Sequence, residues 1–62
     1  MEAKRESIIK ARHSLEFAIE DLNEFLGHCT KLEAMITYHI VENLSLQRVE
    51  IKRLMEAMNE TN

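Results

Sequence analysis

The one glycine of this 62-residue chain, Gly27, lies near its midpoint and is followed by Thr30-Lys31-Leu32-Glu33. Glycine directly after an apolar helical stretch indicates a helix end, because it adopts the left-handed conformation at little cost. A threonine followed three residues later by glutamate is a capping box, in which each side chain accepts a hydrogen bond from the other residue's backbone N–H. The chain contains no proline. The segment from Gly27 to Glu33 is therefore the one clear break in the chain, and the sequence predicts two long helices folded back on each other.

Apolar residues in the first half recur at alternating steps of three and four, the heptad pattern of helices that pack side by side. The pattern predicts a first helix at about residues 3–26 and a turn at residues 27–29. Ile19 and Leu26 widen the apolar stripe on one side. The heptad positions are Ile8, Ala11, Leu15, Ala18, Leu22 and Phe25.

The second half repeats this pattern and predicts a second helix at about residues 31–59, antiparallel to the first. In the resulting layers Leu22 meets Ile36, and Ala18 and Ile19 meet Ile40. The heptad positions are Ile40, Leu44, Gln47, Ile51, Leu54 and Met58, with Leu32 and Ile36 upstream.

Two features of the second helix leave alternatives open. Ser45, with Asn43 nearby, is a residue type that caps helices, so a separate third helix beginning there is one alternative to an unbroken helix. Gln47 is the polar member of the heptad positions. It indicates either a bundle end that water enters or a buried amide that fixes the register of the helices.

A second apolar stripe follows the predicted second helix, roughly opposite its heptad positions. A helix that is apolar on two sides is normally covered on both, and a chain of this length is marginally stable as a monomer. We therefore expect a single-domain, all-α helical hairpin that dimerises through this stripe into a four-helix bundle. The stripe consists of Met35, Tyr38, Leu46 and Val49.

The charged residues suggest how two hairpins would be oriented. Residues 1–13 carry four basic and two acidic side chains, a net charge of +2, whereas residues 14–26 carry four acidic side chains, a net charge of −4. Two hairpins packed end for end would bring opposite signs together. Each exposed ion pair contributes only about 0.2–1 kcal/mol, so the charges bias the orientation without fixing it.

The histidine–carboxylate pairs of the chain do not indicate a metal site. His13-x-x-Glu16 and His39-x-x-Glu42 have the reverse order of the Glu-x-x-His motif of di-iron bundles, and His13 faces away from the heptad positions. We interpret the first pair as exposed, and the second as an ion pair at the rim of the dimer interface that makes association mildly pH-sensitive.

His28 and Cys29 are adjacent in the predicted turn, and we interpret Cys29 as a free thiol. A zinc site there would need further ligands, and a nucleophilic thiolate would need an orienting base. We therefore expect no cofactor, no metal and no catalytic centre.

Four residues of the first helix form a candidate partner-binding surface. Ile9 and Phe17 lie off its apolar stripe, close to Lys10 and Arg12. The leading expectation is a non-enzymatic protein-interaction module, such as an adaptor, chaperone or inhibitor-type regulator. The alternative is an RNA-binding regulator that uses basic residues of the first helix to contact phosphate. The pI of about 5.5 lacks the basic footprint of a typical nucleic-acid-binding protein.

In length, hairpin plan and alternation of small and large layers, the chain resembles the plasmid copy-number (Rop-type) RNA-binding bundles. No sequence motif is shared, so the resemblance is one of architecture. It implies a four-helix bundle made from two hairpins, and RNA as the ligand of the alternative function.

The sequence also suggests where the protein is found. It has a single cysteine, no recognisable signal peptide and no apolar run of the ~18–20 residues that span a bilayer. We expect a cytoplasmic protein without a membrane partner.

Overall fold

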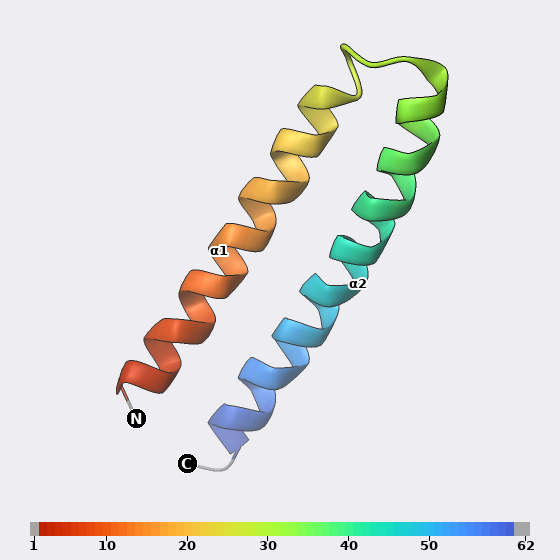
Figure 1. Cartoon of the computed structure of the whole chain (residues 1–62). Coiled ribbons are helices and arrows are strands. Elements are labelled where there is room, and N and C mark those ends of the chain that lie inside the picture. Colours follow the sequence, from red (N-terminus) through yellow and green to blue (C-terminus); the bar gives the residue numbers. More distant parts are fainter. Residues whose placement is uncertain (1, 61–62) are drawn as a thin grey trace.

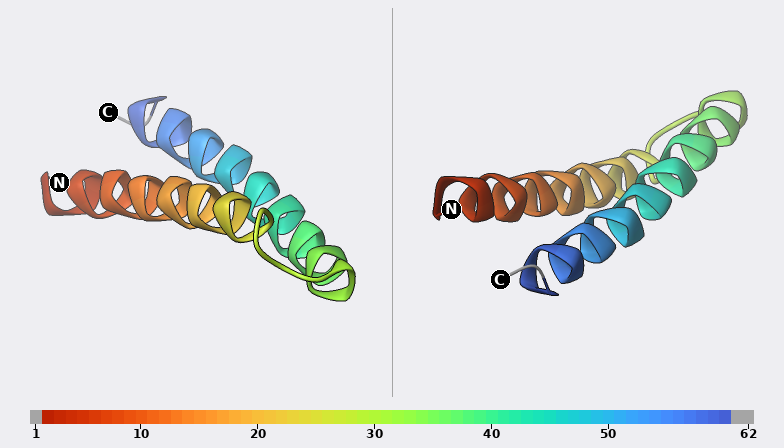
Figure 2. Two further views of the ribbon diagram at one scale, coloured as in Figure 1. Left: turned by 90° about the horizontal axis from the view of Figure 1, so that it is seen from above. Right: turned by 90° about the horizontal axis from the view of Figure 1, so that it is seen from below.

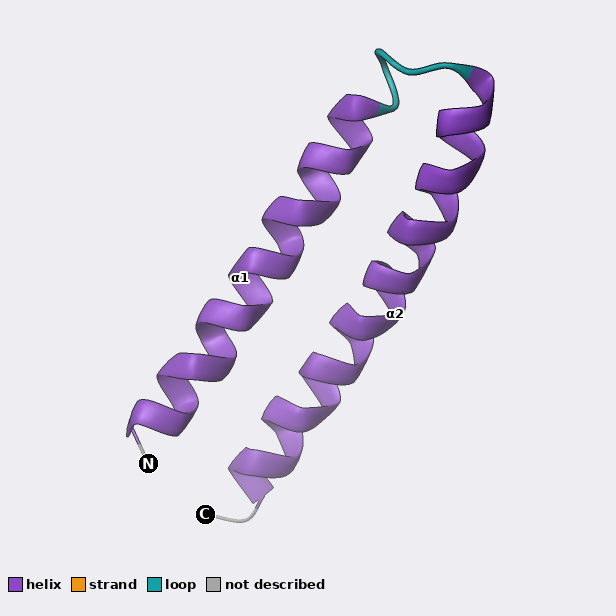
Figure 3. Ribbon diagram, viewed as in Figure 1, coloured by secondary structure: helices purple, strands orange, loops and turns teal. Residues whose placement is uncertain are grey.

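The computed structural model describes residues 2–60, and the side chains of residues 3–59. It is an antiparallel helical hairpin, in which α1 spans Glu2–Phe25 and α2 spans Lys31–Glu60 (Figure 1). Residues 26–30 form the connecting turn (Figure 3). Both helices begin and end within one residue of the predicted ranges. Seen from above and from below, α2 is inclined to α1 (Figure 2).

The beginning of α2 confirms the predicted capping box. The Thr30 N–H donates to Glu33 Oε1 at 3.0 Å, and the Glu33 N–H donates to Thr30 Oγ1 at 3.2 Å. The Thr30 carbonyl accepts the next bond, from the Ala34 N–H at 2.9 Å. Backbone N–H groups at a helix start have no partner within the helix. This pair of residues therefore sets the position at which α2 starts.

The end of α1 differs from the prediction at Gly27. The Gly27 N–H donates to the Glu24 carbonyl at 3.0 Å, and the His28 N–H donates to the Phe25 carbonyl at 2.9 Å. These bonds span three residues and tighten the last turn of the helix. Gly27 does not have a positive φ, so the prediction of a left-handed glycine is wrong. Glycine suits the site because a Cβ here would lie 3.3 Å from the Glu24 carbonyl oxygen.

The Thr30→Ala variant should lose about 1 kcal/mol of unfolding free energy, because the Glu33 N–H loses its side-chain acceptor. Urea unfolding followed by circular dichroism measures this loss. Thr30→Ser keeps the hydroxyl and serves as the matched control. Equal midpoints for Thr30→Ala and the wild type would contradict a stabilising role for the cap.

The two helices meet along a line of buried and half-buried side chains, which we call the seam. On α2 the seam positions recur at steps of three and four, and Arg48 occupies the same series without being buried. Ile19 and Thr37 are the most buried residues, with 8% and 4% of their surface exposed. The seam consists of Ile8, Leu15, Ile19 and Leu22 of α1, Leu26 of the turn, and Ala34, Thr37, Val41, Leu44, Ile51, Met55 and Met58 of α2; the half-buried Glu16, Ala18 and Ser45 flank it.

The seam of α2 keeps Leu44, Ile51 and Met58 of the predicted heptad positions, but the other predicted positions lie outside it. Ile36 is 56% exposed and Ile40 is 43% exposed, so the prediction that they fill the space between the helices is wrong. Leu32, Leu54 and Gln47 are exposed as well, which excludes a buried amide within the hairpin. The physical reason is that the apolar stripe of α2 is about two residues wide. α2 is rotated so that Thr37 and Val41 face α1 in place of Ile36 and Ile40, the residues directly before them.

α2 is continuous from Lys31 to Glu60, so the alternative of a third helix beginning at Ser45 is wrong. Neither helix, over the residues described, is long and apolar enough to cross a bilayer.

Candidate interaction surfaces

The four residues predicted to form the dimer interface all lie outside the hairpin seam. Met35, Tyr38, Leu46 and Val49 are each at least half exposed. Along α2 the charged Glu42 lies between the pair Met35 and Tyr38 and the pair Leu46 and Val49. The hairpin leaves these side chains available to a partner, and their role in dimerisation stays a prediction.

The predicted partner-binding residues of α1 do not form one surface. Phe17 is 64% exposed, and Lys10 lies on the same side of the helix because seven residues make almost two full turns. Ile9 and Arg12 lie toward α2, where each lines a separate hollow between the helices. The structure therefore separates the apolar Ile9 from Phe17.

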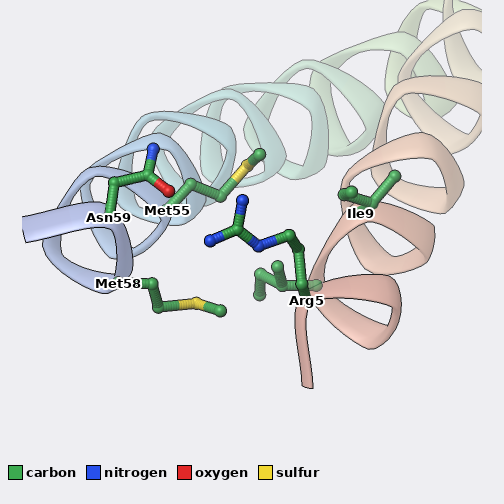
Figure 4. Close-up of a pocket in the computed structure, with 6 residues that line it drawn as sticks. Arg5, Ile9, Met55, Met58 and Asn59 are labelled. Atoms are coloured by element: carbon green, nitrogen blue, oxygen red, sulfur yellow. The ribbon is translucent and has the colours of Figure 1, made fainter. Parts of the chain in front are cut away.

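One hollow lies at the open end of the hairpin and has a volume of about 100 Å³. Arg5 extends from α1 toward α2, with Met55 and Asn59 across from it (Figure 4). Ile9 and Met58 complete the labelled lining. Most of the lining residues are apolar, and the hollow between them shows that this end of the hairpin is loosely filled. The two methionines can adapt their shape to such irregular contacts.

The second hollow lies nearer the middle of the hairpin and has a volume of about 290 Å³. Three cationic side chains and one carboxylate line it, together with Val49. Arg12 Nε lies 3.6 Å from Glu16 Oε1, so one positive charge is partly compensated. Sequence reasoning identified Arg12 but missed Arg48 and Lys52. Arg48 could have been found from the spacing of the seam residues, because it lies four residues after Leu44 and three before Ile51 and so faces α1.

The cysteine and the histidines are not gathered into a chemical site. The Cys29 thiol is half-buried and donates to the Leu26 carbonyl at 3.7 Å. Across the described residues, no three histidine, cysteine or carboxylate side chains lie close enough together to hold a metal ion.

Comparison of the chain with known protein families, with curated proteins and with solved structures gives no match.

Proposed function

We propose that this chain is a small non-enzymatic protein-interaction module that acts as a helical homodimer and binds a partner protein. One observation carries the proposal: Ile19 is the single apolar side chain of the described residues that is more than nine-tenths buried. Large apolar side chains of both helices are exposed instead. Larger exposed apolar patches usually mark interaction sites, so the hairpin has more apolar surface than it uses itself.

We place the module in the cytoplasm and assign it a regulatory role as an adaptor, chaperone or inhibitor. The free Cys29 thiol supports this location, because a reducing compartment keeps thiols reduced. The exposed apolar side chains of both helices support the mode of action, since amphipathic helices bind partners by completing a groove or bundle.

Sedimentation of the purified protein tests the homodimer. At tens of micromolar we expect about twice the chain mass of 7.3 kDa, because a second copy is the simplest cover for the exposed apolar side chains. A monomer that unfolds cooperatively would contradict the homodimer.

The Phe17→Ala variant should capture less of the natural partner, while its helix content and dimerisation stay close to those of the wild type. Phe17 is 64% exposed and contributes little to the hairpin. Pull-down from nuclease-treated lysate measures the captured partner. Charge reversal at Lys10 and Arg12 should have a smaller effect, and added salt should hardly change binding. If the Phe17→Ala variant captures as much partner as the wild type, the exposed side of α1 that carries Phe17 is not the partner-binding surface.

The second candidate is a Rop-like RNA-binding regulatory four-helix bundle. The observation that favours it is the hollow lined by Arg12, Arg48 and Lys52, where cations outnumber the one carboxylate, Glu16. Phosphate contacts release counterions, so RNA affinity would fall steeply with salt. Under this candidate Arg48→Glu would weaken binding far more than Phe17→Ala, which is the reverse of the ranking expected for protein binding.

A further inference from the structure

We propose that a second copy of the chain covers one particular broad side of the hairpin, and that the two copies lie end for end. The inference rests on the proposed homodimer and names its surface. This surface differs from the stripe predicted from the sequence, and we call it the apolar face. It is defined by Ala11, Ala18, Phe25, Ile36, Ile40 and Leu54.

The two broad sides of the hairpin follow from the seam. One residue along an α-helix turns about 100°, so residues directly after seam positions lie on one side and residues directly before them lie on the other. Glu16 follows Leu15, and Lys52 follows Ile51; both line the same hollow, which places them on one common side. The residues before the seam positions therefore share the opposite side.

Two further heptad series lie on that opposite side, one on each helix. On α1, residues 7, 11, 14, 18, 21 and 25 read Ser, Ala, Ser, Ala, Asp and Phe. On α2, residues 36, 40, 43, 47, 50 and 54 read Ile, Ile, Asn, Gln, Glu and Leu. Steps of four and three are the spacing at which helices pack against neighbouring helices. These positions lie in line along each helix, and six of the twelve are apolar: Ala11, Ala18, Phe25, Ile36, Ile40 and Leu54.

The charge content distinguishes the two sides. Over the whole length of the seam, the residues directly before its positions include three charged ones, Asp21 on α1 and Glu33 and Glu50 on α2. The other broad side, formed by the residues directly after the seam positions, carries five charged residues. These are Glu16 and Glu20 on α1 and Glu42, Lys52 and Glu56 on α2. Charged residues are depleted in the cores of protein interfaces. The apolar face is therefore the better interface of the two.

The size of the apolar face suits a dimer. The Cα atoms of the hairpin extend over 47 × 16 × 10 Å, so the footprint of one broad side is about 750 Å², of the same order as the ~800 Å² of accessible surface that each partner buries in a standard interface. Apolar side chains of this face are still available, because Phe25, Ile36, Ile40 and Leu54 are all exposed in the hairpin. Small residues on α1 let the neighbouring helix approach closely.

The orientation follows from the charges of the two halves. Residues 14–46 hold one lysine against six carboxylates, a net charge of −5, and the two terminal segments together hold seven basic against five acidic residues, a net charge of +2. End-for-end packing lays the positive half of each copy on the negative half of the other. It also lays α1 on the α1 of the second copy, so that residues near the midpoint of α1, such as Ser14, meet their own counterparts.

Sedimentation of two matched variants tests the face. Ile40→Glu should raise the dimer dissociation constant at least ~100-fold, because it buries an unpaired carboxylate. Leu46→Glu introduces the same charge on the other stripe of α2 and should leave the dimer intact. A dimer that survives Ile40→Glu, or one that dissociates with Leu46→Glu, overturns the assigned face. A monomeric wild type would instead overturn the homodimer itself.

Cysteine cross-linking tests the orientation without adding a charge. In a Cys29→Ser background, mild oxidation should convert most Ser14→Cys protein into a disulfide-linked dimer. The neighbouring His13→Cys is the control, because its side chain is turned about 100° away. A His13→Cys dimer that forms as readily as the Ser14→Cys dimer, or a sedimenting dimer that Ser14→Cys does not cross-link, would overturn the end-for-end arrangement.

Discussion

The Ile19→Ala variant is expected to lose the cooperative thermal unfolding transition of the protein. Ile19 is 8% exposed and is the most deeply buried apolar residue of the described hairpin. Truncation of a buried isoleucine to alanine costs about 2–5 kcal/mol. A chain of this size rarely has more than about 3–5 kcal/mol from a single core. Circular dichroism against temperature, at a fixed protein concentration, measures the loss.

Phe17→Ala is the matched control for this experiment. It removes a larger side chain only two residues away, but Phe17 is exposed and lies off the seam. Its transition should stay cooperative and shift by only a few degrees. If Ile19→Ala unfolds at the wild-type temperature, the helices do not meet at Ile19 and the seam must be assigned again.

The Thr37→Glu variant should fail to form the hairpin at concentrations at which the wild type is folded. Thr37 is 4% exposed and faces α1 from the middle of the loop-end half of α2. A carboxylate there is buried without a cationic partner, which costs several kcal/mol. Urea unfolding followed by circular dichroism should show no folded baseline.

Thr37→Val separates the effect of charge from that of shape. Valine is close to threonine in size and carries no charge, so this variant loses only the hydroxyl and should remain folded and cooperative. A folded, cooperative Thr37→Glu protein would show that this side of α2 is open to water. It would then favour the sequence-predicted orientation, in which Ile36 and Ile40 face α1.

The local signals of the sequence were sufficient for the hairpin plan. Gly27 and the Thr30–Glu33 capping box act within a few residues, and the hydrogen bonds at the start of α2 are those expected from the residue types alone. The conformation of Gly27 was the exception. A helix also ends by tightening its last turn, and the sequence does not distinguish that ending from a left-handed one.

The rotation of α2 could not be predicted, because its apolar stripe contains two adjacent heptad series. Ile36 and Ile40 form one series, and Thr37 and Val41, one residue later, form the other. Periodicity finds both but does not say which faces α1. Simple hydropathy favours the isoleucines over Thr37, whereas the structure places Thr37 in the seam. The candidate surfaces depended on this choice, which is why Arg48 and Lys52 were missed.

The arginines at the second hollow divide the hairpin into two zones of different cohesion. Arg12 and Arg48 occupy the level between the apolar seam residues of the loop-end half and the methionine-rich open end. These two arginines bury no apolar surface between the helices, and Glu16 offsets only the charge of Arg12, so this level contributes less to helix packing than the apolar levels on either side. We therefore expect amide hydrogens beyond it, toward the two termini, to exchange with solvent through a local opening that needs less free energy than global unfolding. In such an opening Leu15, Ile19 and Leu44 would keep the turn-end halves of the two helices in contact.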